Sequence, residues 1–333
     1  MKRIQLGNTV FEGNNNAYVL DGDPVTLVDT GIAVPDVEAD LRAGLAEFGL
    51  AFSDIEQVLL THWHYDHSGL AGTIQAAGGA TVRAHSADAP LIAGEEDAIQ
   101  AARSYRAGLF DTWGIPTDKR EELQQYLDRD DVLVGRQAEV TPFEDGDVFR
   151  AGTHELEVLH LPGHAAGLCG FAFDSERGTE VFSGDAVLPK YTPNVGGADV
   201  RVEDPLATYA DSLVRFAERE FARAWPGHRD RIDDPTGRAL EILEHHRERT
   251  RRVVDVLNDH GPADAWTVSA HLFGDLSEIH ILHGPGEAYA HLDHLDTADV
   301  VDRDGNDYRL VESDPDVDAL FPRADVQEQK PQT

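Results

Sequence analysis

Short apolar runs and helical periods alternate along the first 85 residues. After Pro35, the residues Val37, Leu41 and Leu45 recur on one helical face, and this spacing predicts an amphipathic helix. A second helix is predicted over 70–77. Apolar runs of strand length lie at 4–10, 16–20, 25–28, 58–60 and 81–84. Strands that alternate with helices in this way predict a sheet covered by helices.

The pattern changes between residues 86 and 141. Two helices are predicted there, over 95–109 and 119–127, with a helix-breaking region at 111–116 between them. The aromatic residues of this insertion are Tyr105, Phe110, Trp113 and Tyr126. We expect a helical cap beside the mouth of a functional site, where it can shape substrate choice. The alternative is that the aromatic side chains only attach the insertion to the rest of the domain.

A second run of strands follows the insertion, and a further unit begins near residue 236. The strands are predicted at 146–149, 155–160, 168–173, 179–183 and 222–225, with a helix over 205–219. The unit at 236–312 shows three helical segments, at 238–259, 267–273 and 287–296, and then two short apolar runs around the turn 302–307.

Three helices followed by a hairpin look like a small winged-helix-like domain. Winged helices often bind DNA, but the helix that would read the bases carries Glu287, Asp293 and Asp296 and no lysine or arginine. We therefore expect this unit to act in packing or in the formation of a homodimer. Residues 313–333 contain three prolines, and we expect a largely disordered acidic tail there.

The charge of the chain is strongly negative. The 333 residues include 28 Lys and Arg against 62 Asp and Glu, a formal net charge of −34. Such an excess argues against electrostatic binding to nucleic acid or to an anionic membrane. The acid is spread along the whole chain and the cations are nearly all arginine, a combination that indicates a halophile, because high salt screens the self-repulsion.

The cellular setting follows from what the sequence lacks. Cys169 is the only cysteine, so no intramolecular disulfide forms, and its apolar surroundings indicate a buried structural thiol. No apolar stretch has the length of a signal peptide at the start or of a membrane span elsewhere. We expect a soluble cytoplasmic protein.

One stretch carries the chemistry. His62, His64, Asp66 and His67 directly follow the apolar run 58–60, where a strand passes into a loop. His62 and His64 alternate and would face the same way, whereas Asp66 and His67 break that period and would turn a second pair of donors toward a neighbouring point. Imidazole and carboxylate are ligands of zinc and of harder divalent ions. The alternative is a histidine-rich turn that binds nothing.

This segment resembles the His-x-His-x-Asp-His signature of the metallo-β-lactamase superfamily, and the further pieces of the family pattern occur in order. Leu161-Pro162-Gly163-His164 resembles the third histidine, Ser183-Gly184-Asp185 the bridging aspartate, and Pro226-Gly227-His228 the last histidine. The resemblance covers roughly 1–235. It implies an α/β fold, a four-layer αββα sandwich with the metal site at one edge between the sheets. Some hydrolases of this fold carry a similar C-terminal winged-helix appendage.

The resemblance also implies the ligand sets. One metal ion would lie on His62, His64 and His164, and the other on Asp66, His67 and His228, with Asp185 bridging. Two dications about 3.5–4 Å apart activate a shared water, and Asp66 can accept its proton. Zinc suits these ligands, and iron and manganese also accept them. Asp29 closes a predicted strand, and we expect it either to brace the ligand loop or to serve as a plain turn residue.

The sequence indicates the substrate less directly. The first hypothesis is metal-dependent hydrolysis of a small ester or thioester, with glyoxalase II-like chemistry, and the alternative is an endoribonuclease or phosphodiesterase of the same superfamily. Glutathione thioesterases of the family commonly continue Glu-Tyr-Thr after the last histidine, where this chain has Arg229-Asp230-Arg231. Tyr191 and Asn194 follow the bridging aspartate, and they either hydrogen-bond an oxyanion or cap a loop. A non-catalytic sensor that has kept its metals is a third hypothesis.

Further histidines lie in the C-terminal unit. His291 and His294 are three residues apart on a predicted helix and would chelate a metal weakly, with His280 and His283 nearby in the sequence. No third donor is fixed by the spacing, so we expect surface histidines. His245 and His246 face different directions on their helix, and we assign them no role.

Overall fold

A computed structural model describes residues 1–7, 13–130 and 135–326. Its first sheet has six strands in sequence order: β1 (Lys2–Leu6), β2 (Asn15–Leu20), β3 (Thr26–Val28), β4 (Gln57–Leu59), β5 (Thr81–His85) and β6 (Val140–Phe143). The first three strands are antiparallel, and β3 to β6 are parallel. Because parallel strands need crossover connections, helices follow β3 and β4 in the chain.

The second sheet has five strands in the order β11-β10-β9-β8-β7. They are β7 (Val148–Ala151), β8 (His154–His160), β9 (Cys169–Ser175), β10 (Gly178–Gly184) and β11 (Arg223–Pro226). Four of them form an antiparallel meander, and β11 joins parallel to β10 at one edge. The predicted strands of both runs are thus present, with shifted ends, and residues 8–10 of the strand predicted at 4–10 lie outside the described part of the chain.

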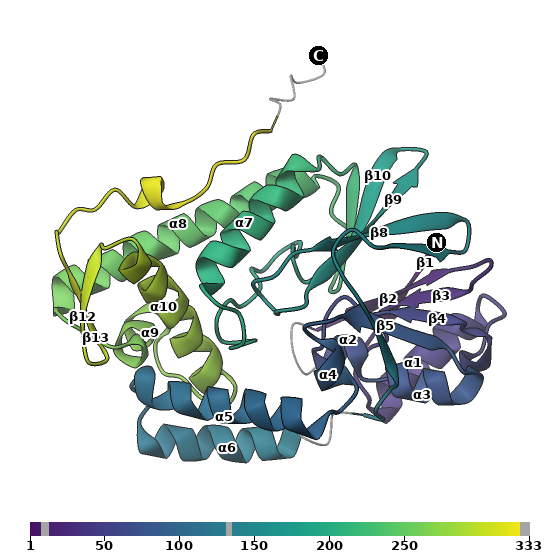
Figure 1. Cartoon of the computed structure of the whole chain (residues 1–333), viewed down its shortest axis with the longest axis horizontal. Coiled ribbons are helices and arrows are strands. Elements are labelled where there is room, and N and C mark those ends of the chain that lie inside the picture. The colour runs from purple at the N-terminus through teal and green to yellow at the C-terminus, as the bar shows by residue number, and fades with distance from the viewer. Residues whose placement is uncertain (8–12, 131–134, 327–333) are drawn as a thin grey trace.

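Helices cover the outer face of each sheet, which gives the predicted four layers (Figure 1). The helices α1 (Pro35–Ala46) and α3 (Ala71–Gly78) lie on the first sheet, and α7 (Pro205–Glu218) and α8 (Pro235–His260) lie on the second. A short 3-10 helix at Phe52–Asp54 precedes β4. Between the sheets, a core that includes Tyr18, Phe171 and Phe182 is fully buried. Cys169 belongs to this core, as expected of a structural thiol.

The insertion consists of α4 (Ala89–Ile92), α5 (Glu96–Thr112) and α6 (Thr117–Asp130). The insertion is attached to the C-terminal unit through Trp113, which is fully buried. The ring of Trp113 lies 5.8 Å from that of Tyr289, and the carbonyl of Trp113 accepts a hydrogen bond from Trp266 N. Trp113 therefore fixes the insertion in place, which was the alternative interpretation of the aromatic residues. A role of the insertion in substrate choice stays a prediction.

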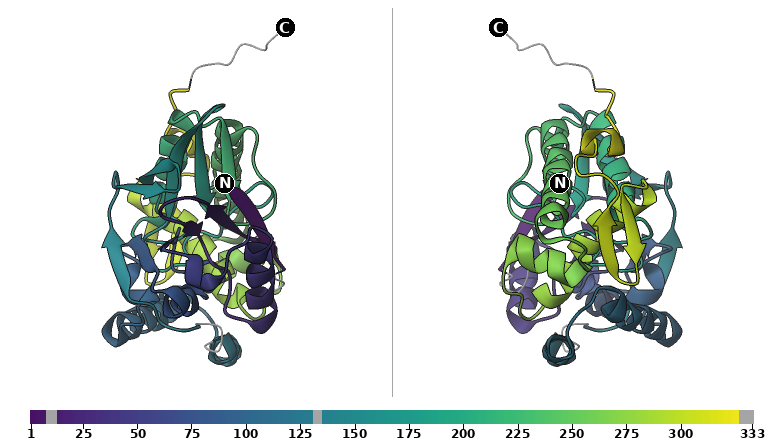
Figure 2. Two further views of the ribbon diagram at one scale, coloured as in Figure 1. Left: turned by 90° about the vertical axis from the view of Figure 1, so that its right-hand side faces the viewer. Right: turned by 90° about the vertical axis from the view of Figure 1, so that its left-hand side faces the viewer.

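The C-terminal unit contains α9 (Ala265–Phe273), α10 (His280–Thr297) and a hairpin of β12 (Val301–Asp304) and β13 (Asp307–Leu310). The predicted helices and hairpin are present, at the end of the molecule opposite the two sheets (Figures 1 and 2). The helix α10 contacts α6, α7, α8 and α9 and buries eleven of its residues. Assignment of this unit as a winged helix stays a prediction. No helix in the described ranges has the length and apolarity needed to cross a membrane.

The predicted disordered tail is partly ordered. A 3-10 helix at Val317–Leu320 lies along α8, and Val317 and Phe321 are buried. Arg247 of α8 donates to Pro322 O at 2.9 Å. Apolar side chains among the acidic ones supply this contact, which the prolines and the charge of the segment concealed. Residues 327–333 lie outside the described part of the chain, so the prediction is untested there.

Candidate metal centre

The predicted ligands come from four places that the two sheets bring together. After the buried strand β4, the chain leaves the sheet through His62 and His64 and enters the short helix α2 (Tyr65–Ser68), which carries Asp66 and His67. His164 lies on the loop between β8 and β9. Asp185 follows β10, and His228 follows β11. Strand ends anchored in two buried sheets can hold these side chains rigidly.

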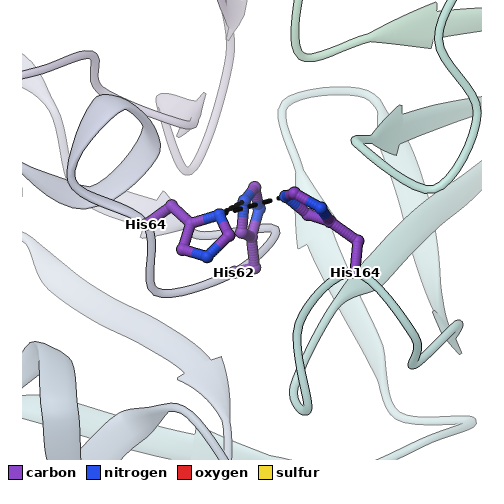
Figure 3. A group of neighbouring side chains, drawn as sticks. All are labelled: His62, His64 and His164. Atoms are coloured by element: carbon purple, nitrogen blue, oxygen red, sulfur yellow. Dashed lines mark hydrogen bonds between the residues drawn. The ribbon is translucent and has the colours of Figure 1, made fainter. Parts of the chain in front are cut away.

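Three imidazoles converge on a first point (Figure 3). Nε2 of His62 lies 2.9 Å from Nδ1 of His64, and Nε2 of His164 lies 3.0 Å from the same atom. His62 is fully buried and His164 is 8% exposed. Three nitrogen atoms this close can serve one metal ion in common.

A second group lies beside the first. Nε2 of His228 lies 3.3 Å from Oδ2 of Asp66 and 3.3 Å from Oδ2 of Asp185. Nε2 of His67 lies 3.7 Å and 3.6 Å from the same two oxygens. Oδ2 of Asp185 is also 3.9 Å from Nε2 of His164, so this carboxylate reaches both groups. The structure therefore brings all seven predicted ligands together, with Asp185 near both groups, and the assignment of each ligand to one of two metal ions stays a prediction.

Asp29 braces two of the ligands. Its Oδ2 lies 3.0 Å from Nδ1 of His67, and the backbone N–H and hydroxyl of Thr61 donate to its two oxygens at 2.8 Å. Since the Thr61 hydroxyl donates its one proton to Asp29, its oxygen accepts from Nδ1 of His62, 3.0 Å away. Both imidazoles are thereby held with Nδ1 protonated and with Nε2 directed into the site.

The remaining histidines follow the same arrangement. Nδ1 of His164 donates to Asn194 O at 2.9 Å, and Nδ1 of His228 donates to Gly13 O at 3.0 Å. His64 is reversed, with Nδ1 in the site and Nε2 3.3 Å from Ala198 O. Each of the five imidazoles thus donates a hydrogen bond from one ring nitrogen to an oxygen atom, and its other ring nitrogen faces the site. This orientation is the one that metal-binding histidines adopt.

The electrostatics differ between the two groups. Burial lowers the pKa of His62 and of His164, and lowers the pKa of His64 to about 3, so these three imidazoles are neutral. Burial also opposes a charge on His67 and His228, but Asp185 and Asp66 outweigh it and raise the pKa of His67 well above its usual range and that of His228 to about 10.

Without a bound cation, protons on these two imidazoles would offset the negative charge of the second group. Burial disfavours charge on Asp66 and Asp185, yet the facing imidazolium groups hold the pKa of both carboxyls well below the usual range. Within the described residues, His67 Nε2 and Asp185 Oδ1 are buried without a hydrogen-bond partner. Negatively charged carboxylate oxygens, together with ligand atoms that have no hydrogen-bond partner, form a site that suits a pair of divalent ions.

The sequence did not indicate the ion cluster that holds the two histidine loops together. Arg201 lies 2.7 Å from Asp88 and 2.6 Å from Asp199. Asp88 accepts hydrogen bonds from the backbone N–H groups of Trp63 and Gly167, and Asp199 accepts them from the Trp63 indole and from Ala166 N. The cluster thus ties the His62–His67 loop to the loop of His164. Asp88 lies 113 residues before Arg201, so no local pattern reveals the whole cluster.

Asn15 is another residue that the motif search missed. It is buried, and its Nδ2 donates to Asp66 Oδ2 at 3.1 Å. An amide at the start of a strand carries no local signal of this contact.

The side chain of Asn194 contacts its own loop and α10. Its amide nitrogen donates to His283 O at 3.1 Å and to Glu287 Oε2 at 2.9 Å, and its amide oxygen accepts from Gly197 N. The side chain is therefore committed to α10, while the backbone carbonyl holds His164. These contacts are those of a loop cap, and a role of Asn194 in binding an oxyanion stays a prediction.

Tyr191 lines a pocket to which none of the seven predicted ligands contributes. Its side chain is 44% exposed and lines a pocket of about 770 Å³ along α8. The guanidinium of Arg229, the residue after His228, lies 4.7 Å from the centroid of its ring. A role of Tyr191 in substrate binding stays a prediction.

Comparison with known proteins agrees with this geometry. A family model of the metallo-beta-lactamase superfamily matches residues 10–228, more than half of the chain. The chain belongs to the metallo-beta-lactamase superfamily. The crystal structure of the metallo-beta-lactamase family protein TTHA1429 from Thermus thermophilus has a TM-score of 0.80 at 30% identity, covering 93% of this chain and 98% of that one.

Two curated relatives of this superfamily chain are informative. It is 26% identical over 303 residues to the probable metallo-hydrolase YqjP of Bacillus subtilis, covering 90% of this chain and 92% of that protein. It is 24% identical over 251 residues to the atrochrysone carboxyl ACP thioesterase dmxR1 of Cryptosporiopsis sp., covering 75% of this chain and 60% of that protein. The similarity to TTHA1429 and to YqjP extends across the C-terminal unit as well as the sandwich.

Proposed function

We propose that the protein is a binuclear metal-dependent hydrolase of a small ester or thioester, with glyoxalase II-like chemistry. The observation that carries the proposal is the convergence of seven ligands, with each of the five imidazoles oriented by an oxygen acceptor at its other nitrogen. A sensor that had retired from catalysis would not need to keep the complete set. We propose zinc as the native metal on the basis of its preference for imidazole and carboxylate.

The bound ions would supply an activated water at neutral pH and polarise the acyl carbonyl. The residues of the chain would position the ions and offset their charge. Asp185 spans the two ligand groups, and Asn15 orients the carboxylate of Asp66. Asp66 is a carboxylate of the second group and would accept a proton from the attacking water. Cys169 contributes no nucleophile, because it is buried in the core and burial raises the pKa of its thiol.

The acyl substrate is supported by similarity and by charge. The relative dmxR1 is named as a thioesterase, and this name supports an acyl thioester as the proposed substrate class. A net charge of −34 opposes a polyanionic substrate. The helix α10, which would be the reading helix of a winged helix, buries Glu287 and His291 against its neighbours. These features favour a small acyl compound over RNA.

The proposed setting is a cytoplasm with high salt. The acidic surface and the scarcity of lysine support it, since salt screens repulsion between like charges. Thermal unfolding in about 0.1 M and about 2 M KCl tests this proposal. A higher melting temperature in the concentrated salt is expected, and equal or lower stability there would contradict it.

The function is tested by initial rates of the metal-replete protein on acyl thioesters, lactones, phosphodiesters and short RNA, in molar KCl. Turnover of thioesters or lactones that EDTA abolishes is the expected result. Cleavage of RNA without any acyl hydrolysis would replace the proposal by the ribonuclease alternative.

A further inference from the structure

A second cluster of ligand-type side chains lies between α8 and α10. His246 comes from α8, and Glu287 and His291 come from α10, where they are four residues apart and face the same way. His246 is 1% exposed, Glu287 7% and His291 0%. One nitrogen or oxygen atom from each lies within 4.8 Å of the others. We expected His291 at the surface, and its burial shows that this expectation was wrong. His246, to which we assigned no role, is buried beside it.

Thr250 fixes the orientation of His291. The Thr250 hydroxyl lies 2.9 Å from His246 O, to which it donates, and 2.7 Å from Nδ1 of His291. Since the hydroxyl has one proton, its oxygen accepts from Nδ1–H of His291. The other nitrogen, Nε2, then carries a lone pair, and it is buried without a hydrogen-bond partner among the described residues. His291 is thus held like a metal ligand of the binuclear centre.

His246 also presents a free nitrogen. Both of its ring nitrogens are buried and have no hydrogen-bond partner in the described part of the chain. Its ring lies 5.5 Å from that of His291, at an interplanar angle of 30°. Burial, with the nearby Arg249, lowers the pKa of His246 and of His291 well below the usual range, so both imidazoles are neutral. Buried polar atoms are nearly always paired, and two unpartnered imidazoles side by side point to a missing ligand.

Glu287 supplies a carboxylate at the same place. Its Oε2 accepts from the Asn194 amide at 2.9 Å, and its Oε1 contacts the guanidinium of Arg249. Arg249 also lines the pocket of about 770 Å³ along α8, together with His245 and Glu248. A guanidinium that neutralises Glu287 while reaching a solvent-filled pocket can turn outward when another cation takes its place.

We propose that His246, Glu287 and His291 form a third metal site, which binds one borderline divalent cation such as zinc and ties α8 to α10. Two imidazoles and one carboxylate form a ligand set that zinc accepts, with a fourth position left for water. Arg249 competes with the cation for Glu287. Asn194 connects Glu287 to the carbonyl that holds His164, so the third site lies two hydrogen bonds from the binuclear centre. The proposal does not depend on the hydrolase activity.

The test is the zinc content per chain, measured by mass spectrometry after equilibration with zinc and removal of the free ion. The wild-type protein is expected to hold about three equivalents and His291→Gln about two, because one of three protein ligands is lost. His260→Gln is a matched control, since His260 stacks on His271 at an exposed helix end, and it should retain the wild-type content. Circular dichroism verifies that each variant folds.

A second background separates this site from the binuclear centre. The variant His62→Ala with His67→Ala, which removes a ligand from each group of the binuclear centre, should still bind one equivalent of zinc or of cobalt, and cobalt should give a visible absorption band that is lost on adding His291→Gln. Arg249→Met, which removes no ligand, should tighten zinc binding in that background by about tenfold, because a like charge beside the ion is removed. No bound metal in that background, or affinity unchanged by Arg249→Met, would overturn the proposal.

Discussion

The carboxylate of Asp29 lies 3.0 Å from Nδ1 of His67, and both side chains are buried. The backbone of Asp29 has a φ of 57°, in the left-handed region that few side chains adopt, and this conformation turns the carboxylate from the end of β3 toward the ligand loop. Asp29 contacts His67 directly and His62 through Thr61, so this strained residue orients ligands of both groups. These contacts favour the bracing role over that of a plain turn residue, and its effect on metal binding stays a prediction.

Replacement of Asp29 by asparagine should weaken metal binding. The amide keeps the size of the side chain but loses the charge that orients His67, and such partners of metal ligands contribute about 10–100-fold to affinity. Zinc affinity measured by competition with a chelator dye checks this. Asp21→Asn, at an exposed turn, is the control. Equal affinities of the two variants would show that Asp29 does not act on the metal.

Replacement of Arg201 by alanine should destabilise the fold. It leaves Asp88 and Asp199 buried beside each other without their cation, and removing one partner of a buried ion pair costs about 3–5 kcal/mol. Denaturant unfolding in molar KCl measures the loss, and the second change Asp199→Asn should restore part of it. Arg215→Ala removes an exposed pair with Asp145 and should cost less than about 1 kcal/mol. Similar losses in both arginine variants would refute the role of the buried cluster.

Replacement of Asn194 by alanine distinguishes loop support from oxyanion binding. Loss of the side-chain bonds to α10 should loosen the carbonyl that holds His164, and should lower metal affinity by about tenfold. Turnover should then recover when zinc is raised to saturation. A kcat that remains about 100-fold low at saturating metal would instead indicate that Asn194 stabilises the oxyanion.

Zinc affinity of the binuclear centre should rise with pH. Without metal, Asp185 and Asp66 raise the pKa of His228 to about 10, so that this imidazole holds a proton at neutral pH, and zinc must displace it. Displacement of one proton gives about a tenfold gain in affinity for each pH unit, and His67, whose pKa is also raised, adds a second proton. Chelator competition between about pH 6 and about pH 8 measures the slope. A pH-independent affinity would contradict the proton-holding state.

Local patterns in the sequence were sufficient where the contacts are local. The helical spacing of Val37, Leu41 and Leu45 predicted α1. The ligand-type side chains at 62–67 were predicted to converge because they are close in the chain and follow the end of a strand, and they do lie together. The positions of His164, Asp185 and His228 beside it came from the family resemblance. Spacing alone does not place side chains from separate strands together.

Contacts between distant segments escaped the sequence analysis. Thr250 lies 41 residues from His291, and Asp88 lies 113 residues from Arg201, so neither pairing has a local signature. His246 carries no local sign of a role, because its partners Glu287 and His291 lie on the distant helix α10. The tail around Val317 and Phe321 was predicted as disordered because its few apolar residues gain stability only from contact with α8.

The most direct test of the central claim is the rate of acyl-thioester hydrolysis as zinc is returned to EDTA-stripped protein. We predict no turnover in the stripped protein and recovery as the binuclear centre fills. Asp185→Asn should recover little activity at the same zinc concentration, because it lacks the charge that bridges the two ligand groups. Full hydrolysis by the stripped protein, or full recovery by Asp185→Asn, would contradict a binuclear metal-dependent hydrolase.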